Sequence, residues 1–213
     1  MDNSKLFAVL FGLFWAIVPI SWAHANPSQT ITLSTQVSPQ YVSGNLIGCQ
    51  ISFEAVRNDP EYSEGRYVYL TGNLSYLYFE GKDMILSLKL GVKGLEENSS
   101  FLAPNEVYLM NGHETNKADF LNSNDSGEGF KIFAFSFSEI GIDATIGSIS
   151  KNENFTFSYA MTPGGLNAIV PINLRVEKED LSDSSRTVIS DRNPDEWKNC
   201  MSSTLKAAKM RLK

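Results

Sequence analysis

Residues 67–79 read YVYLTGNLSYLYF, and residues 84–92 read MILSLKLGV. In both runs large apolar side chains recur at every second position, and side chains two apart share one face of a β-strand. Gly81 and Asp83 supply turn residues between the runs. The pattern predicts a hairpin of two long β-strands, and Gly72 within the first strand predicts a bulge or bend.

Similar alternating runs lie on both sides of this hairpin. The polar stretch 122–129 predicts an exposed loop, and the Pro-Gly-Gly sequence at 163–165 predicts a turn that pairs the last two runs. Many strands without helices between them are typical of antiparallel sheets. We therefore predict a mainly β fold, an antiparallel β-sandwich or barrel, and the sequence does not separate the two. The additional runs cover residues 31–37, 46–56, 107–110, 130–137, 155–161 and 168–176.

The hydrophobic period changes from two to about 3.6 residues near the C-terminus. Asn193 is predicted to cap a helix, and Pro194 suits its first turn. We predict a C-terminal amphipathic α-helix over residues 194–213, packed on the same domain. A polar linker over 177–193 would join it to a β-rich domain over 26–176. Apolar residues recur in the helix at Trp197, Met201, Leu205, Ala208 and Leu212.

The start of the chain has the features of a secretory signal peptide. Lys5 precedes an apolar run over 6–20, and Ala23 and Ala25 match the small-residue pattern that signal peptidase requires. The run is shorter than the roughly 20 residues of a membrane-spanning helix, which disfavours the alternative of an uncleaved anchor. We therefore predict a signal peptide over 1–25 and an exported mature chain, periplasmic or extracellular, with no stable membrane anchor after cleavage.

The chain has two cysteines, Cys49 in the predicted strand 46–56 and Cys200 in the predicted helix. Disulfides persist in oxidising compartments, so an exported chain with two cysteines predicts a Cys49–Cys200 bond rather than two free thiols or a bond to a partner chain. The bond would span 151 positions of the sequence. Closing so long a loop contributes on the order of 5 kcal/mol in the loop-entropy model.

The charge balance limits the classes of partner. The chain has 18 Lys and Arg against 24 Asp and Glu, a net charge of −6 at pH 7. Nucleic-acid binding draws on clustered Lys and Arg side chains. The composition therefore predicts a soluble chain with no nucleic-acid partner.

Candidate catalytic groups are few. His113 is the only histidine after residue 25, and it follows a predicted Asn-Gly turn at 111–112 without a second catalytic motif. Carboxylates are plentiful, but the sequence does not select a pair that the fold would hold in one cleft. We predict no catalytic site, no metal site and no cofactor, and a hydrolase that uses carboxylates or His113 is the alternative. The carboxylate candidates are Glu54, Asp59, Glu61, Glu64, Asp143 and the cluster at 177–183.

Four tyrosines in the 67–79 strand are the best candidates for a ligand or partner surface. Tyrosine combines apolar area with a hydroxyl group, which suits binding surfaces. A place in the core is equally compatible with the pattern, because aromatic residues are favoured in strands. The four residues are Tyr67, Tyr69, Tyr76 and Tyr78.

Export, a β-rich fold, a disulfide and the lack of a catalytic motif together favour a non-enzymatic binding or interaction module. Its partner would be a protein or a small ligand that the sequence does not identify. A cell-envelope structural or adhesive subunit is a further alternative. Chaperone-assembled pilins pair through terminal strands, and a helical C-terminus speaks against that version.

Overall fold

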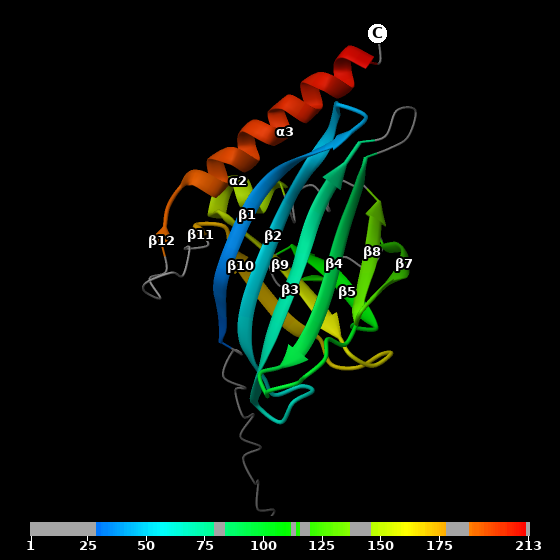
Figure 1. The fold of residues 1–213 in the computed structure, drawn as a ribbon, viewed down its shortest axis with the longest axis vertical. Coiled ribbons are helices and arrows are strands. Elements are labelled where there is room, and N and C mark those ends of the chain that lie inside the picture. The colour runs from blue at the N-terminus through cyan, green and yellow to red at the C-terminus, as the bar shows by residue number, and fades with distance from the viewer. Residues whose placement is uncertain are drawn as a thin grey trace, which may run out of the picture.

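A computed structural model describes residues 29–78, 84–111, 114–115, 120–136, 146–177 and 188–211. The predicted signal peptide and His113 lie outside these residues. Within them the chain forms two β-sheets that pack face to face, with a helix across one end (Figure 1). The predicted mainly β fold with a C-terminal helix is confirmed, and the two packed sheets are those of a sandwich.

The large sheet has eight strands in the spatial order β12-β11-β1-β2-β3-β4-β8-β7. Its neighbouring pairs are antiparallel except β1 and β11, which meet in parallel at Thr35 and Glu177. The strands are β1 (Thr30–Val42), β2 (Asn45–Asp59), β3 (Arg66–Leu77), β4 (Ile85–Gly94), β7 (Phe120–Gly127), β8 (Phe130–Ser136), β11 (Val176–Glu177) and β12 (Val188–Ile189).

The small sheet has four antiparallel strands in the order β10-β9-β5-β6. The helix α2 (Ser148–Asn152) precedes β9, and α3 (Arg192–Arg211) ends the described chain. Figure 1 shows α3 running obliquely across the upper ends of β1 and β2, which it contacts. The strands of this sheet are β5 (Glu106–Asn111), β6 (Glu114–Thr115), β9 (Asn154–Ala160) and β10 (Ala168–Asn173).

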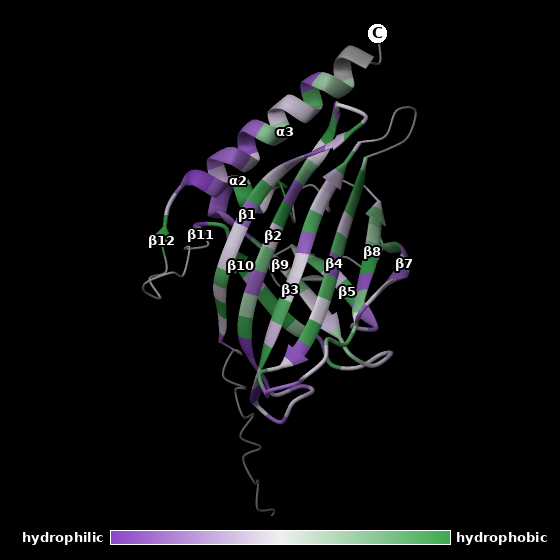
Figure 2. Ribbon diagram, in the orientation of Figure 1, coloured by the Kyte–Doolittle hydropathy of each residue, from purple (hydrophilic) through white to green (hydrophobic). Residues whose placement is uncertain are grey.

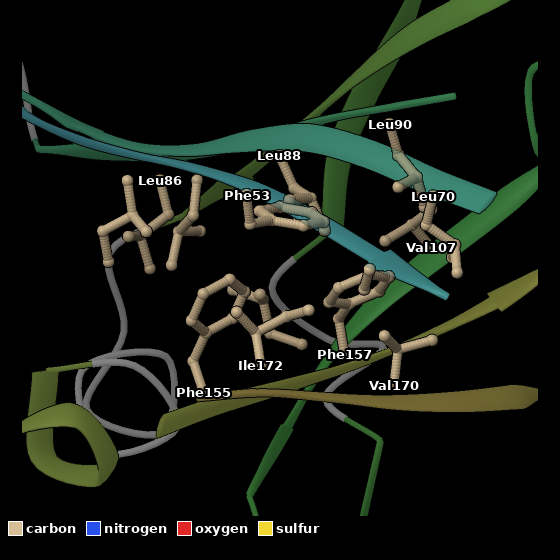
Figure 3. Close-up of a cluster of buried hydrophobic side chains, with 14 of the residues drawn as sticks. Phe53, Leu70, Leu86, Leu88, Leu90, Val107, Phe155, Phe157, Val170 and Ile172 are labelled. Atoms are coloured by element: carbon tan, nitrogen blue, oxygen red, sulfur yellow. The ribbon is translucent and has the colours of Figure 1, made fainter. Parts of the chain in front are cut away.

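Alternation along the strands builds the core between the sheets. Side chains at every second position of β2, β3 and β4 are buried, and Figure 2 shows green alternating with white and purple along these strands. The Phe53 ring of β2 lies 5.7 Å and 5.6 Å, centroid to centroid, from the rings of Phe155 and Phe157 in β9. Figure 3 shows these rings meeting between the sheets, close to Leu88 and Ile172. Burial of this apolar surface is the main term that stabilises the sandwich.

The predicted hairpin is confirmed, with Leu77 of β3 opposite Ile85 of β4. The predicted bulge at Gly72 is wrong, because the register of β3 with both neighbouring strands is continuous there. Gly72 is needed for space instead. A Cβ atom at this position would lie 2.9 Å from Cζ of Phe53 and against the carbonyl oxygen of Lys89. The glycine therefore lets the Phe53 ring pack directly against the backbone of β3.

The predicted exposed loop over 122–129 is also wrong, because β7 occupies most of it and pairs with β8 through two register shifts. β7 is the last strand of the large sheet, and its side chains are mostly exposed on both faces. Without a buried face, nothing imposes an alternating pattern on the strand. Polar residues such as Asn124 and Asp125 suit an edge that must not pair with other chains.

The predicted linker over 177–193 contains more structure than expected. The short strands β11 and β12 pair there, and α3 begins at Arg192. The single strand predicted over 168–176 is divided, because the chain crosses from β10 in the small sheet to β11 in the large sheet at Leu174 and Arg175. Two-residue strands are too short to leave an alternating pattern in the sequence.

Candidate functional site

A groove of about 880 Å³ lies between β1 and the first three turns of α3. One end is marked by Thr35, Glu177 and Asn193. The strand wall is largely apolar, whereas the helix wall is polar. The strand wall is lined by Val37, Pro39, Tyr41 and Leu46, and the helix wall by Arg192, Glu196, Asn199 and Ser203.

A disulfide fixes the helix wall of this groove. Cys49 of β2 and Cys200 of α3 form the predicted bond, with an S–S distance of 2.05 Å and Cα atoms 6.0 Å apart. Trp197, one turn before Cys200, is fully buried in the core. The covalent bond and the buried indole therefore hold the same face of α3 against the large sheet.

A buried hydrogen-bond network joins the two walls at one end. Asn193 is 4% exposed, and its Nδ2 donates to the carbonyl oxygen of Thr35 at 2.9 Å and to Thr35 Oγ1 at 3.0 Å. Thr35 Oγ1 in turn lies 2.7 Å from the carbonyl oxygen of Val176, to which it donates. The predicted capping role of Asn193 is wrong, because α3 begins one residue earlier. Ser190 Oγ accepts the hydrogen bond of the Arg192 backbone N–H at 3.1 Å.

Three other polar side chains in the groove have no hydrogen-bond partner among the described residues. The side chains of Gln36, Asn199 and Ser203 make no hydrogen bond to another described residue. Arg192 and Glu196 form an exposed ion pair at 2.9 Å. Amide and hydroxyl groups that face water can bond to a ligand without breaking a bond within the protein.

The strand wall also has a backbone edge that is open among the described residues. β1 pairs with β2 along one side, but on its other side only Thr35 pairs, with Glu177, among the described residues. From Gln36 to Val42 no described strand lies beside this edge. Pro39 lies within the open stretch and has no N–H to donate. Proline is tolerated in an edge strand where its nitrogen faces away from the neighbouring strand.

A second hollow, of about 330 Å³, lies between β5, β7 and β8. Its two charged side chains are already paired. Lys131 Nζ donates to the carbonyl oxygen of Asn105 at 3.3 Å, and Glu106 accepts from the Tyr108 hydroxyl at 3.1 Å. The groove beside α3 is larger and has an apolar wall opposite a polar one, so it is the stronger candidate site.

The structure separates the four predicted tyrosines. Tyr76 and Tyr78 are 0% and 6% exposed and face the core, so the prediction that they form an accessible surface is wrong. Tyr67 and Tyr69 lie on the opposite face of β3, where Tyr67 is 47% exposed and Tyr69 is half-buried. The physical reason is the strand period, because residues at even and odd positions of β3 face opposite ways. Whether Tyr67 and Tyr69 bind a partner stays a prediction.

On that outer face, Tyr69 belongs to a group of rings and lysines. Lys93 Nζ lies 5.3 Å from the ring centroid of Tyr69 and 4.9 Å from that of Phe101, and Lys89 Nζ lies 5.0 Å from that of Phe130. Burial, followed by the nearby Glu54 carboxylate, raises the pKa of Tyr69 to about 12. Each ring already has a cation from this chain, so the cluster stabilises the outer face by cation–π contact.

Two of the predicted carboxylates come together at the opposite end of the sandwich. Arg57 is fully buried, and its Nη2 lies 2.6 Å from Glu61 Oε2 and 3.9 Å from Asp59 Oδ1. Asp59 is 1% exposed, and its Oδ1 has no hydrogen-bond partner among the described residues. Burial raises the pKa of Asp59 to about 6, a hydrogen bond with Glu61 acts in the same direction, and the Arg57 guanidinium opposes both.

Other predicted chemistry is not assembled in the described residues. Among them, no group of three or more His, Cys, Asp and Glu side chains is placed to hold a metal ion. Glu54 lies half-buried on the large sheet and Glu64 in the β2–β3 turn, away from the groove. His113, Asp143 and residues 178–183 fall outside the described part of the chain. None of the described helices is long and apolar enough to cross a membrane.

Comparison with known proteins reveals no relative, since no family model, no curated protein and no solved structure matches this chain. The candidate site therefore rests on its own geometry and chemistry.

Proposed function

We propose that this chain is an exported, non-enzymatic binding module whose ligand site is the groove between β1 and α3. The observation that carries the proposal is a groove of about 880 Å³ with one apolar and one polar wall. Ligand sites usually measure about 300–1,000 Å³ and combine apolar lining with a few polar groups that orient the ligand. A ligand with an apolar side and hydrogen-bonding groups on the other fits both walls.

Both walls are held in place without a ligand. The Cys49–Cys200 bond fixes α3 on β2, and the Asn193–Thr35 hydrogen bonds fix the start of α3 on β1. A site that is already ordered loses less conformational entropy when a ligand binds. This preorganisation supports a binding role for the groove.

The disulfide also supports the proposed export. Both cysteines of the chain are used in it, and no free cysteine remains. Disulfides persist in oxidising compartments and are rare in the reducing cytosol. Together with the predicted signal peptide over 1–25, the bond supports a mature protein in the periplasm or outside the cell.

The hydrolase and envelope-subunit alternatives have weaker support. A catalytic acid or base must come within hydrogen-bond reach of its substrate, but Asp59 is 1% exposed and does not line the groove. The groove carboxylates Glu177 and Glu196 accept bonds from the Ser190 hydroxyl and from Arg192. The last described element is a helix, whereas donor-strand assembly uses terminal strands.

Titration of the mature protein with N-phenyl-1-naphthylamine, a neutral apolar fluorophore, tests the proposal. Binding should shift the amide NMR signals of residues 35–41 and 192–203. Ser203→Phe places a ring in the groove and should weaken binding at least about tenfold, which is about 1.4 kcal/mol.

Ser202→Phe is the matched control. Both serines are exposed on α3, but only Ser203 lines the groove. The control variant should bind the fluorophore like the wild-type protein. Equal affinity for the two variants, or no binding of the fluorophore at all, would contradict the proposed site.

A further inference from the structure

We infer that the ligand of the groove is an extended peptide segment that adds as a strand beside β1, with a cationic side chain at the end near Glu177. The inference rests on the proposed function of the groove and names the class of partner. Four features of the groove support it: its length, its open strand edge, the spacing of its polar wall and its charge. Pro39 acts against unselective pairing at the same edge.

The groove has the length of a short extended peptide. Along β1 it runs from Thr35 to Tyr41, and six steps of about 3.3 Å give about 20 Å. Along α3 it runs from Arg192 to Ser203, and eleven steps of 1.5 Å give about 17 Å. A chain of about six residues in the extended conformation fills this length.

On the side of β1 away from β2, no described residue pairs with Gln36–Val42, and this edge supplies the backbone partner for such a peptide. β11 already meets β1 at Thr35, so an added strand would continue the line of β11 past Gln36–Val42. Peptides commonly bind in this way to exposed sheet edges, where main-chain hydrogen bonds give affinity and pockets for alternate side chains give specificity. Side chains of the added strand that face inward would enter the groove against Val37 and Leu46.

Pro39 makes the edge selective. Its nitrogen is expected to face the open side, because β1 keeps its pairing with β2 at Pro39 and Cys49. An incoming strand therefore finds the carbonyl of Pro39 but no N–H at that position. The missing bond weakens pairing with an arbitrary strand, so the contacts inside the groove must contribute a larger share of the affinity. Proline is one of the devices by which natural sheets prevent unwanted edge pairing.

The polar wall of α3 matches the repeat of an extended chain. Asn199 and Ser203 lie four residues apart, so they are separated by about 6 Å along the helix axis. Residues of one face of a strand repeat every about 6.6 Å. The two uncommitted side chains can therefore bond to equivalent positions of the peptide two residues apart.

Charge distinguishes the two ends of the peptide. The groove is lined by two carboxylates, Glu177 and Glu196, and by one guanidinium, that of Arg192. Arg192 is bonded to Glu196 and is also attracted by the Glu177 carboxylate, which accepts a hydrogen bond from the Ser190 hydroxyl, so the two carboxylates share one guanidinium. The whole chain has a net charge of −6. A Lys or Arg of the peptide is thus favoured beside Glu177 and an acidic residue is disfavoured there.

The test uses the mature protein and an array of end-blocked hexapeptides. One half of the array has Lys at position 1 and apolar residues at positions 2, 4 and 6, and the other half has Lys at position 6 and apolar residues at positions 1, 3 and 5, which covers parallel and antiparallel addition. We expect members of one half to bind, and replacement of their Lys by Glu to weaken binding at least about tenfold. Glu177→Gln should reduce this preference for Lys, whereas the exposed and distant Glu97→Gln should not change it.

N-methylation of the peptide tests the strand pairing directly. Methyl groups on the amides that face β1 should reduce affinity at least about tenfold, and methyl groups on the alternate amides should not. If methylation of the two sets of amides weakens binding equally, or if neither weakens it, strand addition is overturned. If no peptide binds while N-phenyl-1-naphthylamine still binds in the groove, the peptide inference fails and the proposed function stands. If neither binds, both fail.

Discussion

The two ends of the sandwich are closed in different ways. Under α3, a disulfide and neutral hydrogen bonds hold the helix, and a groove of about 880 Å³ remains beside it. At the other end in Figure 1, the turn between β2 and β3 reaches the turn between β9 and β10. There the Tyr62 ring stacks on Tyr159 with centroids 6.3 Å apart, and its hydroxyl donates to the carbonyl of Leu166. Buried Arg57 and Asp59 lie in this second closure.

The difference follows from how each closure is stabilised. A covalent bond keeps α3 on β2 whether or not the neighbouring surface is filled, so space for a ligand can remain. The other end has no covalent bond and depends on packed rings and paired charges, which must stay in contact to contribute. The end under α3 is therefore suited to binding, and the end with Asp59 is sensitive to pH.

The largest expected effect is at the covalent closure. Replacing both Cys49 and Cys200 by Ala should lower the free energy of unfolding by about 4–5 kcal/mol, because the bond closes a loop of sequence separation 151. Urea unfolding monitored by circular dichroism measures this loss. The variant should also lose fluorophore binding, because α3 forms one wall of the groove. An unchanged unfolding midpoint would show that the noncovalent contacts of α3 suffice.

The next largest effect is a difference in unfolding free energy between variants at a buried and at an exposed tyrosine of β3. Tyr76 pairs with Cys49 across the strands, is 0% exposed, and its hydroxyl lies 2.8 Å from Met84 Sδ. Tyr76→Ser should lower the free energy of unfolding by about 3–5 kcal/mol, because it leaves a cavity in the core. Tyr67→Ser, at a site that is 47% exposed, should change it by about 0.5 kcal/mol or less. Thermal unfolding compares the two variants, and equal losses would contradict the assignment of faces.

The third effect concerns the ionic closure and depends on pH. The pKa of Asp59 is raised by burial to about 6 from its ordinary value near 3.8. The stabilising contribution of the protonated Asp59 carboxyl is therefore fully present below about pH 4 and is lost as the pH rises through 6. Asp59→Asn cannot ionise, so at pH 7.5 it should be more stable than the wild type by about 1–3 kcal/mol.

The free energies of unfolding of the wild type and of Asp59→Asn, compared at pH 4 and pH 7.5, check the direction of this effect. At pH 4 the advantage of Asp59→Asn should disappear, because the wild-type carboxyl is neutral there as well. Glu97→Gln, at an exposed position, is the control and should shift the unfolding midpoint little at either pH. A lower stability of Asp59→Asn at pH 7.5 would mean that the attraction between Asp59 and Arg57 outweighs burial.

The smallest effect lies in the hydrogen bonds at the end of the groove. Asn193→Ala removes two buried hydrogen bonds to Thr35 and should lower the free energy of unfolding by about 1–2 kcal/mol. Asn199→Ala, on the exposed face of the same helix, should change it by about 0.5 kcal/mol or less. For ligand binding the order should reverse. Asn199→Ala should weaken binding more than Asn193→Ala, because Asn199 faces the groove without a partner among the described residues. Urea unfolding and fluorophore titration together measure both effects.

Parts of the fold could be predicted because they depend on neighbours in the sequence. The hairpin of β3 and β4 follows from alternation over 67–79 and 84–92, and α3 follows from the spacing of residues such as Trp197 and Met201. Edge strand β7 could not be predicted, because a strand exposed on both faces carries no alternation.

The candidate site was harder to predict than the fold. Gln36 and Asn199 lie on opposite walls of the groove but are more than 150 positions apart in the chain, so no local motif contains both. The tyrosine pattern divided β3 into two faces but did not say which face lies against the small sheet. Glycine at position 72 predicts a bulge or bend from the sequence, whereas in the structure it leaves room for Phe53.

The sequence by itself determined the β-rich class, the long central hairpin, the terminal helix and the pairing of Cys49 with Cys200. These features depend on periodicity within one segment, or on there being only two cysteines to join. The tertiary structure alone decided the burial of Tyr76, the raised pKa of Asp59 and the groove between β1 and α3. Each of these results from contacts between segments that are remote in the chain, and such contacts exist only once the sheets and the helix have packed.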